Sequence, residues 1–481
     1  MSRLSILCGA ALLLSGCAVG PDFHRPAAPP VHALTPAPIP ATLGAGPDRE
    51  AVAAGAEVPR DWWLGFGSET LDGALARALA ENADLDAARA ALRVAEEQAR
   101  AQRGALLPTL GADASIARQR SADALSPTLD SGQNPYTLRT AQLSIGYALD
   151  LFGGQRRALE SSLALVEYQR FEAEAARTTV VANLVVALMR AAALRGEVDA
   201  AARTVALQER IVTLARRQRE LGAASTAAVI AQESALALDR GALAPLQKSL
   251  AQTRDLVTAL EGGYPDGRTE PALDLDTLAL PPVPLALPSR LVEMRPDVRA
   301  AEALCHSASA SIGVATAAML PDVTLSANTG RLSEQAGSLF AAGNRFYGAA
   351  GDLAQPLFAG GALLHHRRAA VAAYEQSLAQ YRSTVIGAFQ NVADVLQALE
   401  ADAAALEAAR SAESTAQRTW ELVQRQVGAG DASHLTDMQA EIAYLSARAA
   451  RLDVQATRFG DVVALYQALG GSWSEPAAPG R

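Results

Sequence analysis

The chain has 481 residues, of which 50% are hydrophobic, 19% are charged and only 5% are aromatic. Alanine and leucine therefore supply most of the apolar surface, which is typical of a helix-rich protein, and the length allows about three domains unless the chain is built from repeats. A net charge of -9 argues against nucleic-acid binding, because contacts to phosphates require a basic surface. The three cysteines, Cys8, Cys17 and Cys305, match no disulfide framework and no zinc or redox motif.

Residues 1–16 have the layout of a secretory signal peptide. Arg3 precedes an apolar stretch that ends at Leu14 and is too short to span a membrane. The run Leu14-Ser15-Gly16-Cys17 is typical of a bacterial lipobox, so we expect cleavage before Cys17 and a lipid on its thiol, which anchors the protein without a transmembrane helix. An aspartate directly after the lipid-modified cysteine would favour retention at the inner membrane. The residue at this position is Ala18, so we expect the protein to be sorted to the outer membrane. A signal peptide that contains a cysteine by chance is the alternative.

Residues 17–60 are rich in proline, alanine and glycine and are expected to form a lipid-anchored, extended segment, because such a composition cannot hold a helix. Folded sequence is expected to begin near Asp61. Trp62 and Trp63, which follow, are interpreted as aromatics that anchor a core or an interface.

An internal repeat divides the remainder into residues 61–270 and 271–472, followed by a tail at 473–481. Three pairs of segments recur in the same order about 210 residues apart: Asn82 to Leu110 with Arg295 to Val323, Asp150 to Gly154 with Pro356 to Gly361, and Arg217 to Ser225 with Arg425 to Ser433. Chance similarity between alanine-rich helices is the alternative, but the matches include proline and glycine residues, which end helices and strands and form turns.

Two very long helices are predicted, one in each repeat. Residues 155–221 and 362–427 contain no proline and one glycine each, and an uninterrupted helix of this length reaches about 100 Å. Short glycine-containing connections lead to second helical stretches at 227–260 and 434–469, so each repeat is expected to form an antiparallel helical hairpin. Pro245 has no counterpart in the second repeat, and we expect a kink there.

Short segments with alternating polarity precede each long helix. In residues 141–149, every second side chain is apolar, and 323–328 show the same period; 109–118 and 346–353 are weaker examples. Segments of about ten residues with one apolar face suit membrane β-strands that face lipid on one side and water on the other. A half-buried soluble sheet gives the same pattern and stays an alternative.

The number of these strands constrains the assembly. Two hairpins give about four strands, fewer than the roughly eight of the smallest closed membrane barrels. An open sheet edge is not tolerated in lipid, so the barrel must be shared between chains. A dimer and a trimer both give an even strand number, and strand counting does not choose between them.

The chain resembles the TolC-like outer membrane factors, in particular their OprM/NodT lipoprotein branch. The resemblance covers nearly the whole mature chain and rests on the following runs: Cys17 with Val19-Gly20-Pro21-Asp22-Phe23, Trp62-Trp63, Leu71 to Asn82, Leu107-Pro108, Asp150 to Gly153, Arg295 to Glu302, Leu320-Pro321, Gln355 to Phe358 and Gly360-Gly361. It implies a mostly α protein with a membrane β-barrel portion, in which a homotrimer forms a shared 12-stranded β-barrel continued by a trimeric α-barrel. It further implies an outer-membrane channel of a tripartite efflux system that conducts small molecules and extends into the periplasm.

The resemblance also implies partners and sites. A periplasmic adaptor (membrane fusion) protein docks on the hairpin tips, and the inner-membrane pump is most often of the resistance-nodulation-division class. The corresponding tip residues are Gly222, Ala223, Ser225, Gly430 and Ser433.

An acidic ring in many family members narrows the periplasmic aperture. The family aspartate falls on Gln439 here, so Asp431 and Asp437 are candidates to replace it. Both aspartates could equally well have a structural role instead, either capping a helix or placing a favourable negative charge in its first turn.

No catalytic constellation is found, and an enzyme, a metal site and a cofactor other than the lipid on Cys17 are not expected. His365 and His366 are adjacent on a helix and point in different directions, Cys305 has no activating partner, and the glycine pairs lack the lysine of a phosphate loop. Type I protein secretion and a periplasmic coiled-coil scaffold without a pore are the alternative functions. An enzyme of the cell envelope is disfavoured.

Overall fold

The computed structural model describes residues 18–27, 42–43, 50–54, 58–120, 135–265, 272–285 and 292–471. The predicted signal peptide, the predicted lipid site at Cys17 and the C-terminal tail lie outside these residues. The chain forms two compact units, and each takes segments from both halves of the sequence. The sheet unit comprises residues 1–26, 92–169 and 301–381, and the hairpin unit comprises 27–91, 170–300 and 382–481.

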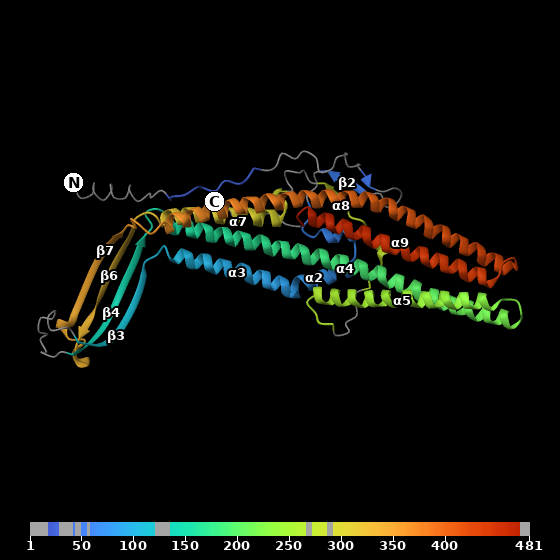
Figure 1. The fold of residues 1–481 in the computed structure, drawn as a ribbon, viewed down its shortest axis with the longest axis horizontal. Helices are drawn as coiled ribbons and strands as arrows, with labels where there is room; N and C mark the ends of the chain where they lie inside the picture. The colour runs from blue at the N-terminus through green and yellow to red at the C-terminus, as the bar shows by residue number, and fades with distance from the viewer. Residues whose placement is uncertain are drawn as a thin grey trace. The chain divides into compact units, whose positions relative to one another are not determined.

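The order helix, two strands, long helix, shorter helix occurs twice (Figure 1). The first set is α3 (Ala83–Gly104), β3 (Thr109–Gln119), β4 (Tyr136–Leu149), α4 (Gly154–Glu220) and α5 (Thr226–Leu260), and the second is α7 (Pro296–Ala317), β6 (Asp322–Ser333), β7 (Arg345–Ala354), α8 (Ala362–Ala429) and α9 (His434–Ala468). The prediction of a mostly helical fold with two long helices and two pairs of strands is therefore confirmed. Pro245 lies inside α5, which continues past it.

Short elements complete the hairpin unit. They are β1 (Thr42–Leu43), β2 (Glu50–Ala54), the 3-10 helices η2 (Trp62–Phe66) and η3 (Leu275–Thr277), α2 (Glu69–Glu81) and β5 (Val283–Leu285). The strand β2 pairs with β1 in antiparallel and with β5 in parallel orientation. Ser68 caps α2 by accepting a hydrogen bond from the Leu71 amide, which satisfies one of the free donors at the helix start.

The core of the hairpin unit surrounds the middle of α4. An apolar 18-residue stretch of this helix is 61% buried inside the protein, which is typical of a core helix. Gly196 brings α4 close to α9, because a Cβ at this position would lie 2.3 Å from Leu452 Cδ1. The predicted aromatic anchors are both buried: the ring of Trp62 stacks on Tyr466 at 4.9 Å, and Trp63 lies beside it.

The four strands of the sheet unit form one antiparallel sheet in the order β3-β4-β6-β7. A row of directly opposite residues shows the register: Leu110 faces Ile145, Ile145 faces Ala327, and Ala327 faces Ala349. Directly opposite residues share a face of the sheet, so the alternation predicted along each strand continues across all four strands. Between β6 and β7 lie two short 3-10 helices, η4 (Ala336–Ser338) and η5 (Ala342–Asn344).

Two carboxyl groups meet between the helices of the second hairpin. Burial, together with the hydrogen bond and the negative charge of Asp402 on α8, raises the pKa of Asp461 on α9 to about 7. Between about pH 4 and pH 7, the folded chain therefore holds a proton that the unfolded chain has lost. The free energy of unfolding should fall as the pH rises through this window.

We predict that Asp461→Asn, which mimics the protonated carboxyl group, raises Tm less at pH 5 than at pH 8, and that the two increases differ by about 2 °C or more. Thermal unfolding at both pH values measures the difference. Asp394→Asn is the control, since Asp394 is another aspartate on α8 and is not part of this pair. Equal changes of Tm for Asp461→Asn at pH 5 and pH 8 would contradict the prediction.

Candidate functional site

The sheet has one apolar and one polar face. The apolar face carries exposed side chains, among them Leu110, Ile116 and Leu143, whose exposed fractions are 72%, 75% and 50%. The opposite face carries the polar side chains of the same strands: Asp113, Ser115, Gln142, Ser144, Thr324, Ser326, Asn328 and Asp352. Exposed leucine and isoleucine on one face and polar groups on the other suit a strand wall between lipid and water.

The two helical hairpins end in turns of the same construction. Gly222 and Gly430 both have a positive φ, +77° and +84°, which a residue with a side chain rarely adopts. The next amide closes the helix end in each case: Ala223 N donates to Gln218 O at 2.8 Å, and Asp431 N donates to Gln426 O at 2.8 Å.

A serine begins the following helix in both turns. Ser225 accepts a hydrogen bond from the Ala228 amide at 3.1 Å, and Ser433 accepts one from the Thr436 amide at 3.2 Å. Each side chain satisfies a donor that the first helical turn leaves free. The predicted tip residues therefore form two matching, glycine-closed and serine-capped turns.

The three aperture candidates have different surroundings. Asp431 is exposed in the second tip turn, and Gln439 is exposed on α9. Asp437, in the first turn of α9, accepts a hydrogen bond from Trp420 Nε1 at 3.1 Å, and the Trp420 ring stacks on Tyr444. Asp437 and Gln439 are two positions apart on one helix and point in different directions, so they cannot both line the same opening.

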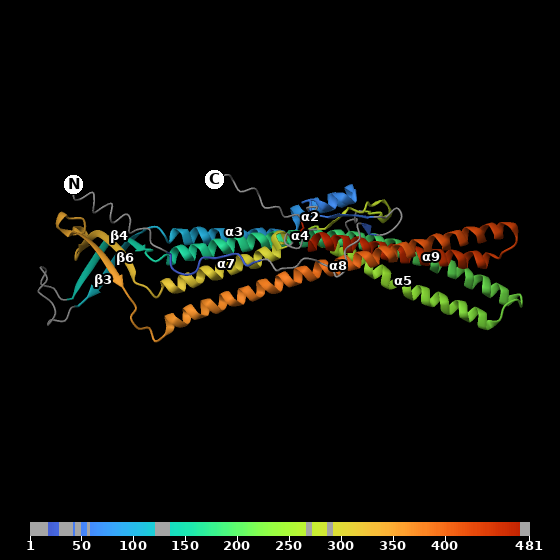
Figure 2. The same cartoon turned by 90° about the horizontal axis from the view of Figure 1, so that it is seen from above.

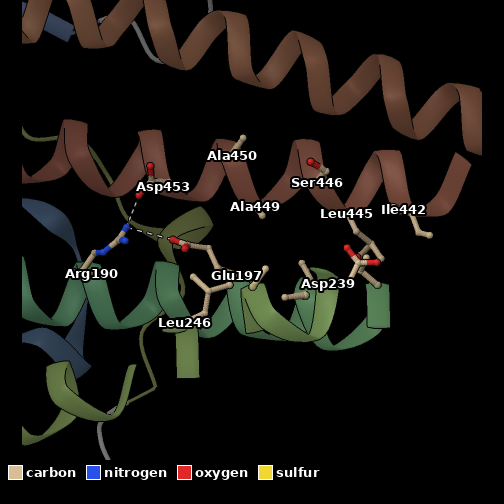
Figure 3. A pocket seen from close by; sticks show the side chains of 14 residues that line it. Arg190, Glu197, Asp239, Leu246, Ile442, Leu445, Ser446, Ala449, Ala450 and Asp453 are labelled. Atoms are coloured by element: carbon tan, nitrogen blue, oxygen red, sulfur yellow. Dashed lines mark hydrogen bonds and ion pairs between the residues drawn. The ribbon is translucent and has the colours of Figure 1, made fainter. Parts of the chain in front are cut away.

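Ion pairs connect the two hairpins to each other. Arg190 on α4 contacts Asp453 on α9 and also pairs with Glu197 at 3.2 Å (Figure 3). Further along, Arg203 Nε lies 2.8 Å from Glu441 Oε1. These contacts join the first hairpin to the second through two half-exposed arginines.

Beside these pairs, residues of α4, α5 and α9 line a groove of about 510 Å³, and five of the lining residues are alanines (Figure 3). Figure 2 shows the course of these three helices. Burial raises the pKa of Glu197 and of Asp239, which both border this groove. Proton uptake by these carboxyl groups is therefore favoured, relative to exposed carboxylates, by the cost of burying a charge.

In the sheet unit, Arg157 clamps the N-terminal segment that follows Cys17. Its buried guanidinium donates to Asp22 Oδ1 at 2.7 Å and to the Val19 carbonyl oxygen at 3.2 Å, and it also pairs with Glu160 at 2.8 Å. The hydrogen bond from Arg157 and its positive charge hold the pKa of Asp22 below its usual value. We name residues 18–26 the strap.

Two further contacts hold the strap on α7. Phe23 stacks on His306, with ring centroids 4.6 Å apart, and His306 Nε2 lies 2.9 Å from Glu160 Oε1. Arg25 pairs with Glu302 at 3.0 Å. At the start of the strap, Val19 N donates to Phe152 O at 3.0 Å, in the connection between β4 and α4.

Sequence reasoning missed Arg157 and His306. Their strap partners lie 135 residues or more away along the chain, and local periodicity carries no information on such pairs. No sequence signal marks the clamp, because the burial of Arg157 is known only from the folded structure.

The residues considered as reactive or metal-binding candidates, Cys305, His365 and His366, have ordinary surroundings. Cys305 is fully buried, and burial raises the pKa of its thiol, which disfavours the reactive thiolate. His365 and His366 are exposed at the start of α8. Within the described residues, no group of three or more histidine, cysteine, aspartate or glutamate side chains is arranged to hold a metal ion.

The family model described as "Outer membrane efflux protein" matches residues 74–263 and 287–471. The chain is 33% identical over 471 residues to the toluene efflux pump outer membrane protein TtgC of Pseudomonas putida, an alignment that covers 97% of this chain and 94% of that protein. The outer-membrane channel OprN superposes with a TM-score of 0.80 at 24% identity, over 95% of this chain and 99% of the other. The open state of the MtrE outer membrane channel of Neisseria gonorrhoeae gives a TM-score of 0.76 at 26% identity, over 95% and 98%.

The strap contacts lead to a prediction for Gly313 on α7. A Cβ at this position would lie 2.8 Å from the Val19 carbonyl oxygen and 2.7 Å from Arg157 Cγ, so Gly313→Ala should displace the strap. We expect the Val19 amide to exchange its hydrogen at least about tenfold faster, as measured by hydrogen-deuterium exchange.

Gly241→Ala is the control for this exchange measurement, because Gly241 is a helical glycine with open space around it. This change should leave Val19 unaffected and stabilise α5 by about 0.5–1 kcal/mol. If Gly313→Ala also only stabilised its helix and left Val19 protected, the close approach of the strap would be wrong.

Proposed function

Because the chain belongs to the outer membrane efflux protein family, we propose that it is the outer-membrane channel of a tripartite efflux system and conducts small molecules across the periplasm and the outer membrane. One observation carries this function. A sheet with one apolar and one polar face continues directly into α4 and α8, helices of 67 and 68 residues. Strands of this kind line a pore through lipid, and helices of this length, about 100 Å each, extend it through the periplasm.

The functional unit is proposed to be a homotrimer. The strands β3 and β7 are the edges of the four-stranded sheet, and their free backbone groups cannot face lipid. Pairing β3 of one protomer with β7 of the next closes the sheet without an edge. Three copies give a barrel of about twelve strands, wide enough for an aqueous pore when compared with the roughly eight strands of the smallest barrels.

A lipid on Cys17 is proposed to anchor each protomer beside its own strands. Val19 N is hydrogen-bonded to Phe152 O, just after β4 ends. Cys17 precedes Val19 by two residues and can therefore lie no more than about 7 Å further along the chain. The acyl chains would enter the membrane where the sheet leaves it, and no cofactor besides this lipid is proposed.

Partners are proposed to dock at the hairpin tips. A periplasmic adaptor protein would contact the two turns that contain Gly222, Ala223, Ser225, Gly430 and Ser433, and an inner-membrane pump of the resistance-nodulation-division class would supply the substrate. The shared construction of the two turns supports this idea, because one adaptor hairpin could meet the same backbone geometry at both. Opening of the periplasmic end would then require the second hairpin to move against the first.

The ion pairs between the hairpins lead to a prediction about opening. Arg190→Gln combined with Arg203→Gln removes the contacts to Asp453 and Glu441 and should weaken the closed state, because each pair contributes about 0.2–1 kcal/mol. We expect a higher single-channel conductance in planar bilayers or more frequent openings.

The matched control is Arg216→Gln combined with Arg240→Gln. It removes the same two charges, but from pairs with Glu233 and Glu209 that join α4 to α5 within one hairpin. Conductance should stay at the wild-type level. An equal change in both double variants would show that net charge, and not contact between hairpins, sets the conductance.

The aperture candidates lead to a separate prediction. If Asp431 and Asp437 line the periplasmic opening, replacing both by alanine should reduce the preference for cations, because a ring of three or six carboxylates attracts cations into a narrow pore. Reversal potentials in asymmetric salt measure this preference. Trp420→Phe tests the position of Asp437 separately by removing the indole donor. Unchanged conductance and selectivity in the double alanine variant would exclude both aspartates from the opening.

A further inference from the structure

Two arginines lie directly opposite each other on the apolar face of the sheet. Arg331 on β6 and Arg345 on β7 are register partners, and Arg331 is also opposite Ala141 on β4. All three share the face that carries Leu143 and Leu110. Like charges in directly opposite positions destabilise a sheet, so this pair needs a compensating anion.

The protein supplies no such anion from its described residues. Arg331 Nη1 donates to the carbonyl oxygens of Phe340 and Ala341, at 2.7 and 3.0 Å, and its guanidinium lies over the Phe340 ring. The side chain of Arg345 is exposed and has no hydrogen bond or ion pair within the described ranges. Neither arginine has a carboxylate partner there, and the aspartates of the strands lie on the opposite face.

Two more arginines extend the positive charge toward the connections between the strands. Arg139 is directly opposite Ile116, and Arg118 lies one row further out on the same face. Arg139 donates to the Glu334 carbonyl oxygen, which leaves its charge without a carboxylate partner in the described part of the chain. Four arginines thus occupy one end of this face, beside Thr137 and Ser333, while its other end carries Val323, Leu325 and Leu353.

A hollow of about 510 Å³ adjoins the two opposite arginines. Its floor contains the small side chains Ala112, Ala114 and Ala141, with Leu143 beside them, and Phe340 stands at the same rim as the arginines. Thr329 lies on the same face and also lines the hollow, whereas the side chains of Asp113 and Gln142, which border it too, point to the polar face of the strands. The hollow therefore has a methyl-lined floor that suits an acyl chain and a positive rim that suits a phosphate.

Arg331 and Arg345 lie at the end of the sheet where one strand connects to the next, opposite the end where the strands connect to the helices. Arg331 and Arg345 are separated by the short connection from β6 to β7, whereas the other ends of these strands lead to α7 and α8. In an outer-membrane channel with periplasmic helices, this end reaches the outer leaflet. The arginine band then stands at the level of lipid headgroups.

We propose that this end of the apolar face binds a phosphorylated glycolipid of the outer leaflet, with its phosphate between Arg331 and Arg345 and an acyl chain over the alanine floor. Arginine suits this role, since its planar guanidinium donates two hydrogen bonds to a phosphate at once. The proposal rests on the proposed channel function, because that function orients the sheet in the membrane.

The test uses the purified full-length protein in neutral detergent and bisphosphorylated lipid A as the probe. Native mass spectrometry across a lipid A concentration series gives the apparent Kd. We expect Arg331→Gln combined with Arg345→Gln to weaken binding at least about tenfold. Arg345→Gln alone should weaken it in the same direction, and it removes an exposed side chain without partners in the described residues, so the fold is retained.

Arg367→Gln combined with Arg368→Gln is the matched control, because these exposed arginines on α8 remove the same charge from another surface. This variant should bind lipid A as the wild type does. Arg331→Lys combined with Arg345→Lys keeps both charges and should retain part of the affinity.

Three further probes separate the possible sources of the anion. Lipid A without phosphates, inorganic phosphate and phosphatidylglycerol should each bind at least about tenfold more weakly than bisphosphorylated lipid A. Equal binding of any one of them, or wild-type affinity in the Arg331 and Arg345 variants, would overturn the proposal.

The conductance of the same preparations in phosphatidylethanolamine bilayers tests the channel function separately from the lipid site. A wild-type protein that conducts but does not prefer lipid A overturns only the lipid site. A wild-type protein that does not conduct overturns the channel function.

Discussion

The need to pair every backbone group in lipid is the constraint on which the rest of the structure depends. The sheet presents two edge strands, β3 of 11 residues and β7 of 10 residues. Each unpaired amide or carbonyl group in hydrocarbon costs several kcal/mol, so an isolated four-stranded sheet cannot persist in a membrane. The proposed assembly of protomers would therefore be part of folding for this protein. The stability of the sheet unit should depend on protomer concentration in the way that is usual for obligate oligomers.

The hairpin unit combines tight packing with weak polar links. Gly196 allows α4 to approach α9 closely, and the buried stretch of α4 is rich in alanine, which suits a thin wall of adjacent helices. The links between the hairpins are ion pairs of half-exposed arginines, which contribute about 1 kcal/mol or less each. Buried apolar contacts between α4 and α9 also join the two hairpins, so any shift of one hairpin against the other has to overcome this packing as well as the ion pairs.

Much of the fold was predictable because its signals are local. Long stretches without proline predicted α4 and α8 within two residues at each end, and the alternation in residues 141–149 predicted β4, which begins earlier at Tyr136. Contacts between distant segments were not predictable, since Asp402 and Asp461 are each ordinary helix residues until α8 and α9 pack together. The tip turns were predictable from glycine and serine, but the hydrogen bond from Trp420 to Asp437 depends on the hairpin geometry.

The strap adds a constraint that neither the strands nor the long helices supply. Arg157 binds Asp22, Val19 and Glu160 at once, and its guanidinium is buried, so removing any one partner leaves a poorly solvated charge. The close approach at Gly313 excludes larger side chains on α7 and holds the strap against the same helix. The segment next to the proposed lipid site is thus fixed to the unit that contains the four-stranded sheet. The inter-hairpin ion pairs lie in the other unit, so movement of the hairpins need not break any of the contacts that hold the strap.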